Sequence, residues 1–142
     1  MRILLLNGPN LGTLGRRQPE IYGSMTLDEI VEAARAHALE RGSLLEAFQS
    51  NHEGALIDRL EAGDFDAVIA NLGALSHTSY ALHDALVACE RPSVEVHISD
   101  ITNREPWRRT SVTAPATRHQ VIGRGWRGYL EAIDLLLDSP SD

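Results

Sequence analysis

Short, mostly apolar runs recur along the chain, and longer helical or irregular segments separate them. Each run has four to six residues, too few for a buried helix but typical of a strand in the interior of a sheet. The runs therefore predict five strands. The predicted strands are Ile3–Leu6, Leu44–Gln49, Asp66–Asn71, Ser93–Ile98 and His119–Ile122.

Helical patterns occupy most of the segments between and after these strands. Two of these segments begin with the capping-box pattern Ser/Thr-x-x-Glu, at Thr26 and at Ser50, and apolar residues then follow at helical spacing. Segment 99–116 is instead polar and rich in arginine. The predicted helices span 26–41, from Ser50 through Leu60, from His77 to about Cys89, and about 124–137.

Strands that alternate with helices form a parallel sheet with helices on both faces. The chain has 142 residues, of which 43% are hydrophobic and 23% charged, and this predicts one globular α/β domain over 1–142. At this size we expect a flavodoxin-like three-layer fold, a five-stranded parallel sheet in the order 2-1-3-4-5. Ligands of such folds bind outside the carboxyl ends of the strands, where the strand order reverses.

Polar side chains stand at three of the predicted strand ends. The first strand runs into Asn7-Gly-Pro-Asn10, the third ends in Asn71, and the fourth ends in His97-Ile-Ser99. Because the carboxyl ends of parallel strands share one edge, these amide, imidazole and hydroxyl groups are expected to meet there. The pattern predicts a site for a small polar ligand.

The segment Asn7–Gly23 has four glycines, two prolines and almost no apolar periodicity. A long structureless segment in a small domain is either disordered or a functional loop. This one carries Arg16, Arg17 and Tyr22 rather than low-complexity sequence, which favours a functional loop. We predict a lid at about 16–23 over a site at the end of the first strand.

The composition excludes several classes of function. The sequence has no lysine, and all thirteen basic residues are arginine, which excludes Schiff-base chemistry and a P-loop lysine. The net charge of −7 argues against nucleic acid as a partner. The apolar stretches are too short for a signal peptide or a bilayer span. A single cysteine, Cys89, cannot form an internal disulfide and is expected to be a small buried hydrophobic residue. These features predict a cytoplasmic protein without membrane attachment.

Two groups of residues could carry acid–base chemistry. His97 lies two residues after Glu95, so both side chains leave the strand on the same face. The pair is either an acid–base group oriented by a carboxylate or a structural hydrogen bond in a buried strand.

The second group is in the predicted lid, where Tyr22 lies near Arg16 and Arg17. A phenol has a reference pKa of about 10, and cations would favour its phenolate. The alternative is a tyrosine that packs on arginine at the surface.

Further candidates flank the same edge. His77 and Asp84 would share one face of the third helix, as part of a site or as an ordinary surface pair. The motif Thr102-Asn-Arg-Glu105 would cap a short helix that carries Arg104 and Arg108 on one face. The two arginines would bind an anionic or polyhydroxylated ligand, or they would form a solvated charge cluster. The histidines show no metal-ligand spacing. The glycines at 123, 125 and 128 are attributed to close helix–strand packing rather than to a dinucleotide site.

These motifs together resemble type II 3-dehydroquinate dehydratase. The matching motifs are NGPNLG, LGRRQPEIYG, QSNHEG, HTS, VEVHIS and RE-x-x-R, in order and at matching spacing from Leu4 to about Leu136. The resemblance implies reversible dehydration of 3-dehydroquinate to 3-dehydroshikimate by anti elimination through an enolate, without metal or organic cofactor. It also implies a flavodoxin-like subunit in a homododecamer of four trimers. Departures from the pattern include His83, Asp100 and Thr102.

The resemblance also implies roles for individual residues. Tyr22 matches the base that removes the C2 proton, Arg17 matches the lid arginine that keeps the phenol ionised, and Arg104 resembles a more fixed cationic neighbour. Asn10 resembles the amide that holds a water molecule against the enolate oxygen.

His97 matches the acid that protonates the leaving C1 hydroxyl, with Glu95 beside it. Asp84 resembles a residue that reaches the site from a neighbouring subunit. The remaining matches are to substrate-binding groups, namely Asn71 and the backbone of Ile98 and Ser99 for the carboxylate, and His77 and Arg108 for the ring hydroxyls.

Two other functions compete with this hypothesis. A flavodoxin-type binding module would hold flavin or nucleotide, but it has no use for Tyr22 among arginines. A structural protein that kept the fold and lost the activity is the third possibility, and the complete set of Tyr22, Arg17, Asn10 and His97 argues against it.

Overall fold

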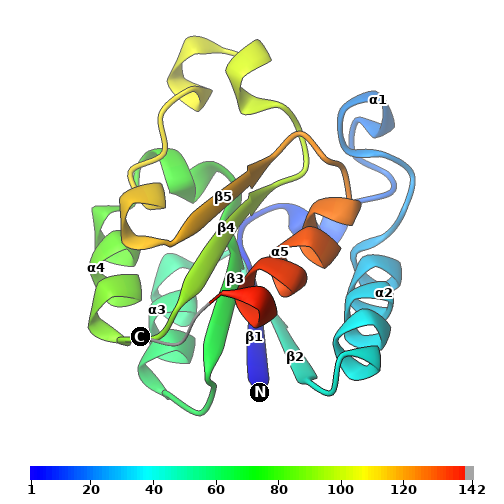
Figure 1. The fold of residues 1–142 in the computed structure, drawn as a ribbon. Coiled ribbons are helices and arrows are strands. Elements are labelled where there is room, and N and C mark those ends of the chain that lie inside the picture. The colour runs from blue at the N-terminus through cyan, green and yellow to red at the C-terminus, as the bar shows by residue number, and fades with distance from the viewer. Residues whose placement is uncertain (140–142) are drawn as a thin grey trace.

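The computed structural model of the chain describes residues 1–139. Its sheet has five parallel strands in the order β2-β1-β3-β4-β5, which confirms the expected topology (Figure 1). The strands are β1 (Arg2–Asn7), β2 (Leu44–Gln49), β3 (Ala67–Asn71), β4 (Ser93–His97) and β5 (His119–Ile122).

Helices cover both faces of this sheet, as expected for a three-layer fold (Figure 1). One face carries α2 (Leu27–Glu40) and α5 (Arg127–Asp138), and the other carries α3 (Glu53–Glu61) and α4 (Tyr80–Ala88). The side chains of β1 alternate between the two cores. Ile3 and Leu5 join one cluster, and Leu4 and Leu6 join the other. Burial on both faces explains why this strand reads as a continuous apolar run.

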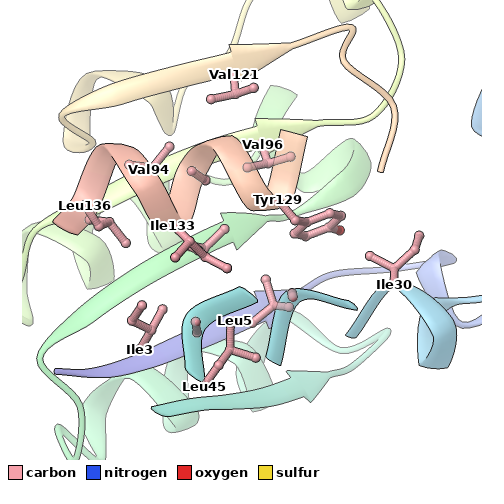
Figure 2. Close-up of a cluster of buried hydrophobic side chains, with 14 of the residues drawn as sticks. Ile3, Leu5, Ile30, Leu45, Val94, Val96, Val121, Tyr129, Ile133 and Leu136 are labelled. Carbon is pink, nitrogen blue, oxygen red and sulfur yellow. The ribbon is translucent and has the colours of Figure 1, made fainter. Parts of the chain in front are cut away.

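The core beneath α2 and α5 is shown in Figure 2. Tyr129 and Ile133 of α5 are fully buried there, with Val94, Val96 and Val121 from β4 and β5. A Cβ atom on Gly128 would lie 3.4 Å from the Cγ1 atoms of Val96 and Val121. The close helix–strand packing predicted at this glycine is therefore confirmed. At Gly125 the same interpretation was wrong, because nothing lies within 4 Å of an added Cβ atom and the residue has φ 60°.

Local capping signals predicted one helix start well and another poorly. Thr26 and Glu29 form the predicted capping box of α2, with reciprocal hydrogen bonds of 3.2 Å to each other's backbone N–H groups. No such box opens α3, where Glu53 is itself the first helical residue. Its carboxylate instead accepts a hydrogen bond from Ser79 Oγ at 2.5 Å.

The predicted helix from His77 begins later. α4 starts at Tyr80, because the Ser79 hydroxyl accepts a hydrogen bond from the Leu82 N–H and caps the helix there. His77 ends a separate 3₁₀ helix, Gly73–His77, so the predicted shared helical face of His77 and Asp84 was wrong. Cys89, expected to be buried, is half-buried at the end of α4.

The predicted short helix capped by Thr102 is not formed. Pro106 disfavours the helical conformation of the preceding residue, and Glu105 is accordingly extended, with φ −54° and ψ 144°. Segment 99–118 contains three 3₁₀ helices, Ile101–Asn103, Pro106–Arg108 and Ala114–Ala116. This segment forms the yellow arch above the carboxyl ends of the strands in Figure 1.

The segment after β1 is more ordered than the sequence predicted. It contains a 3₁₀ helix, Leu11–Thr13, and a one-turn helix, α1 (Pro19–Tyr22). Leu11 and Leu14 are buried in the core, which fixes its first half, whereas none of the residues of α1 is fully buried. Among residues 1–139, none of the helices is long and apolar enough to span a bilayer.

Candidate active site

A pocket lies where the strand order reverses, at the carboxyl ends of β1, β3 and β4. All of the predicted site residues except Glu95 and Asp84 line it. These residues come from four separate parts of the chain, which the fold brings together. The pocket is lined by Pro9, Asn10, Leu11, Arg17, Tyr22, Asn71, Gly73, Ala74, His77, His97, Ile98, Ser99, Ile101, Arg104 and Arg108.

Two loops that carry pocket residues pass very close together beside the pocket. The Gly8 N–H donates a hydrogen bond of 2.8 Å to the Asn71 carbonyl. A Cβ atom on Gly8 would lie 2.5 Å from the Leu72 carbonyl oxygen, so a side chain at this position would push the two loops apart.

A buried tyrosine orients the pocket amide of Asn71. Asn71 Nδ2 donates to the Tyr129 hydroxyl at 2.8 Å, and that hydroxyl donates to Asn7 Oδ1 at 2.8 Å. Burial raises the pKa of Tyr129 far above its ordinary value, so the hydroxyl keeps its proton. Asn71 Oδ1 accepts from the Gly73 N–H at 3.3 Å. With both ends of the amide fixed, one Asn71 N–H is left for a ligand.

The imidazole of His97 is held by a buried carboxylate. His97 Nε2 lies 2.8 Å from Glu95 Oε2, and Glu95 is completely buried. Burial acts to raise the pKa of Glu95, but the hydrogen bonds from His97 and Thr113 outweigh it and hold the pKa of that carboxyl below its usual value. An ionised Glu95 fixes a proton on His97 Nε2, so Nδ1 is the ring nitrogen that a ligand can reach.

Tyr22 lies between two arginines. Arg104 Nη1 donates a hydrogen bond of 2.6 Å to the Tyr22 hydroxyl oxygen and also contacts Ser99 Oγ at 3.2 Å. The Arg17 guanidinium carbon lies 4.8 Å from the centre of the Tyr22 ring, and that of Arg104 lies 5.2 Å from it. Tyr22 therefore packs on arginine, as the surface alternative expected, and it also lines the pocket.

His77 lies beside His97, with ring centres 6.1 Å apart. His77 Nδ1 donates to the Thr110 carbonyl at 2.8 Å, which leaves Nε2 for a ligand. Burial lowers the pKa of His77, and the positive charges of His97 and Arg108 lower it further. A neutral imidazole at this position can either donate or accept a hydrogen bond.

The pocket is positively charged although the chain is acidic. Arg17, Arg104 and Arg108 line it, and none of the described lining residues is acidic. Arg108 is fixed by a hydrogen bond of 2.6 Å to Glu105 and by stacking 4.0 Å over the ring of Trp107. Fixed guanidinium groups in a partly enclosed site favour an anionic, polyhydroxylated ligand.

Two predicted site residues lie outside this pocket. Glu95 is behind His97 and reaches the site only through that ring. Asp84 is exposed on α4, in a separate groove between α3 and α4 that Leu60 and Cys89 also line. The structure of one chain does not bring Asp84 to the pocket, so its contribution to a neighbouring subunit stays a prediction.

Three residues around the site were not singled out from the sequence. Tyr129 appeared only as one member of an apolar helical stripe. Thr113 and Gln120 lie in an irregular segment and a weak strand, yet both donate hydrogen bonds to Glu95, Gln120 Nε2 at 2.9 Å. No local pattern indicates these contacts, because their partners lie 18 to 122 positions away in the sequence.

Residues that depart from the family pattern make hydrogen bonds within the subunit. His83 Nδ1 donates to the Val112 carbonyl at 2.8 Å, which ties α4 to segment 99–118. The Asp100 carboxylate accepts from the Thr102 N–H at 3.0 Å and caps the 3₁₀ helix that follows.

Within residues 1–139, no three His, Cys, Asp or Glu side chains gather in a way that could hold a metal ion.

Known proteins of one family share this sequence and fold. The family described as "Dehydroquinase class II" matches residues 1–137. The chain is 54% identical to a 3-dehydroquinate dehydratase of Roseiflexus castenholzii over 139 residues, 96% of this chain and 88% of the relative. It is 48% identical to a catabolic 3-dehydroquinase of Aspergillus clavatus, over 93% and 89% of the two chains.

A solved structure agrees with these sequence relatives. The type II dehydroquinase from Butyrivibrio crossotus superposes with a TM-score of 0.95 at 40% identity, over 97% of this chain and 98% of that one. Sequence and fold therefore agree along almost the whole length of the chain. The protein belongs to the class II dehydroquinase family.

Proposed function

We propose that the protein is a 3-dehydroquinate dehydratase, which reversibly removes water from 3-dehydroquinate to give 3-dehydroshikimate. The reaction would serve the shikimate pathway, for aromatic amino acid biosynthesis, or the breakdown of quinate. The observation that carries the proposal is one pocket that holds Tyr22 between two arginines and His97 against a buried carboxylate. Elimination of a hydroxyl β to a ketone needs such a base and such an acid.

Tyr22 acts as the base in this proposal. Its phenolate removes the proton from C2 of the substrate, and the C–H electrons move into the ketone to form an enolate. Arg104 donates to the phenol oxygen at 2.6 Å, and Arg17 lies over the ring. Both cations stabilise negative charge on that oxygen, and neither competes for the proton, because a guanidinium does not deprotonate.

The enolate needs hydrogen-bond donors at its oxygen. We assign this role to the amide of Asn10, acting through a water molecule, because Asn10 lines the same pocket as Tyr22. The backbone supports the assignment. Asn10 adopts a left-handed conformation, φ 69°, and its N–H donates to Asn51 Oδ1 at 3.0 Å, which fixes the residue at the pocket rim.

His97 completes the elimination. When the enolate collapses, the C1–O bond breaks and the C1=C2 double bond forms. The His97 imidazolium gives its Nδ1 proton to the departing hydroxyl, which leaves as water, and the ring becomes a neutral imidazole with its proton on Nε2. Glu95 stays ionised and compensates the positive charge of the imidazolium. The base and the acid come from different elements, a loop helix and β4, as expected if they act on opposite faces of the substrate in an anti elimination.

The other pocket residues would bind the substrate. The free N–H of Asn71 and the backbone N–H groups of Ile98 and Ser99 suit the substrate carboxylate. His77 and Arg108 suit the ring hydroxyls, since a neutral imidazole and a fixed guanidinium supply directed hydrogen bonds. In this proposal the site uses no metal or organic cofactor.

We also propose that residues 16–23 form a lid. Gln18 at the start of α1 has φ 40°, an unfavourable value for a residue other than glycine. The helix it precedes has four residues, none of them fully buried. A short, strained and poorly buried turn that carries the base can be displaced at low cost.

The assembly and its place in the cell stay predictions. The homododecamer would bring Asp84 of one subunit to the pocket of its neighbour, and its mass in solution would be twelve times that of the chain. We expect a cytoplasmic enzyme.

The test is the ultraviolet absorbance of the conjugated product, followed after 3-dehydroquinate is mixed with protein dialysed against a chelator. We expect the absorbance to rise with wild-type protein. Tyr22→Phe should cut kcat by about 10²–10⁴, the usual contribution of an acid–base group. Tyr80→Phe, at a tyrosine that is 70% exposed on α4, is the control. If folded wild-type protein gives no rise in absorbance, the proposed function is refuted. If Tyr22→Phe keeps full activity, Tyr22 is not the base.

A further inference from the structure

The carboxylate behind His97 is held by more than the histidine. Glu95 Oε2 accepts from His97 Nε2 at 2.8 Å and from Gln120 Nε2 at 2.9 Å, while Oε1 accepts from the Thr113 hydroxyl. Each carboxylate oxygen thus has its own donor from outside β4. Thr113 is completely buried, as Glu95 is. Neither Thr113 nor Gln120 lines the pocket.

We propose that Thr113 and Gln120 are positioning residues for the reaction, because they fix the plane of the Glu95 carboxylate and, through it, the ring of His97. This inference rests on the proposed function, in which His97 protonates the leaving hydroxyl. Neither residue touches the substrate. They act on the direction in which His97 Nδ1 points into the pocket.

The physical reason is the weak torsional preference of a carboxylate. The terminal torsion of a glutamate is broad, so Glu95 has no rotamer of its own that would hold its two oxygens in place. A bond to His97 alone leaves the group free to rotate about that contact. The Thr113 hydroxyl at the opposite oxygen removes this freedom. The hydrogen bond from Thr113 also lowers the pKa of Glu95, which stabilises the ionised carboxylate.

Segment 109–118 is built to present the Thr113 hydroxyl rigidly. On the side before Thr113, the Val112 N–H donates to the Ser76 carbonyl at 2.7 Å and the Val112 carbonyl accepts from His83 Nδ1 at 2.8 Å. After it, the Ala116 N–H donates to the Thr113 carbonyl at 3.0 Å. The backbone around Thr113 is therefore tied to α4 and to the 3₁₀ helix that ends in the pocket residue His77.

Two substitutions at Thr113 separate hydrogen bonding from packing. Thr113→Val keeps the branched shape and removes the hydroxyl, whereas Thr113→Ser keeps the hydroxyl and removes a methyl group. We expect Thr113→Val to lower kcat by about ten- to a hundredfold, a part of the contribution of a general acid, with KM within about threefold of wild type. Thr113→Ser should keep kcat within about threefold of wild type, because its hydroxyl still orients the carboxylate and, through it, the acid. A packing role predicts the reverse order.

Gln120 supplies the second variant. Its side chain is accessible at the edge strand β5, so Gln120→Met, which keeps the length and removes the donor, should fold even if Thr113→Val does not. We expect Gln120→Met to lower kcat by less than Thr113→Val does. In the double variant Thr113→Val/Gln120→Met, the fall in kcat should differ from the product of the two single effects, since both donors act on one carboxylate.

The outcomes distinguish this inference from the function on which it rests. Wild-type protein without dehydratase activity would overturn the proposed function. Active wild-type protein with unchanged kcat in folded Thr113→Val, or equal losses in Thr113→Val and Thr113→Ser, would overturn the positioning role. If Thr113→Val does not fold, unchanged kcat in Gln120→Met would overturn the role instead.

Discussion

Replacing Tyr129 with phenylalanine isolates the buried hydroxyl that connects the strand ends. The phenyl ring keeps the packing of α5 on the sheet, so the change removes one oxygen and two hydrogen bonds, each 2.8 Å long. It leaves Asn71 Nδ2 without an acceptor and Asn7 Oδ1 without a donor, in a place closed to solvent. Each buried group left unpaired costs about 1–3 kcal/mol.

The expected loss is therefore about 2–6 kcal/mol in the free energy of unfolding. In a chain of this size, each kcal/mol corresponds to about 3–5 °C, so Tm should fall by about 6–30 °C. Because Asn71 lines the pocket and loses the partner that orients its amide, KM for 3-dehydroquinate should also rise.

The assay is thermal unfolding at a fixed protein concentration, since assembly makes Tm depend on concentration. Tyr80→Phe is the matched control, because Tyr80 is 70% exposed and a surface change of this kind costs less than about 0.5 kcal/mol. If Tm of Tyr129→Phe equals that of Tyr80→Phe, the hydroxyl does not hold the strand ends together and the reasoning is wrong.

Two further predictions concern charge. The folded-state pKa of Glu95 lies below its usual value, so its contribution to stability is present at neutral pH and is lost as the pH falls through that lowered value. The difference in urea midpoint between wild type and Glu95→Gln should therefore shrink as the pH is lowered from neutral into the acid range, and a difference independent of pH would contradict this. Arg17→Ala removes a cation 4.8 Å from the Tyr22 ring and should move the rising limb of the pH–rate profile to higher pH. Arg16→Ala, at an exposed position outside the pocket, should leave that limb in place.

The sheet and the location of the pocket followed from the sequence for one physical reason. A strand buried on both faces is mostly apolar, so a polar residue at its end is conspicuous. Asn71 and His97 stand out in this way, and the pocket forms between them. The expected strand order then determined which edge of the sheet carried the site.

Helix starts were harder to predict, because several side chains near a helix start compete to cap it. Ser79 rather than a residue near His77 caps α4, and Pro106 prevents the helix that Thr102 appeared to start. The contacts of Thr113 and Tyr129 were beyond prediction for a different reason. Both depend on which atoms meet across the fold, and the sequence pattern gives only the face on which a residue lies.

The absence of lysine bears on how the site depends on pH. The three cations of the pocket, Arg17, Arg104 and Arg108, are guanidinium groups, which keep their charge throughout the range in which a phenol or an imidazole titrates. A lysine in the place of Arg104 would titrate in the same range as the phenol that it contacts and would compete for the abstracted proton. With arginine, the field at the base stays constant. The proposed reaction then depends on Tyr22 and on the hydrogen-bonded pair of His97 and Glu95, which is where the substitutions above act.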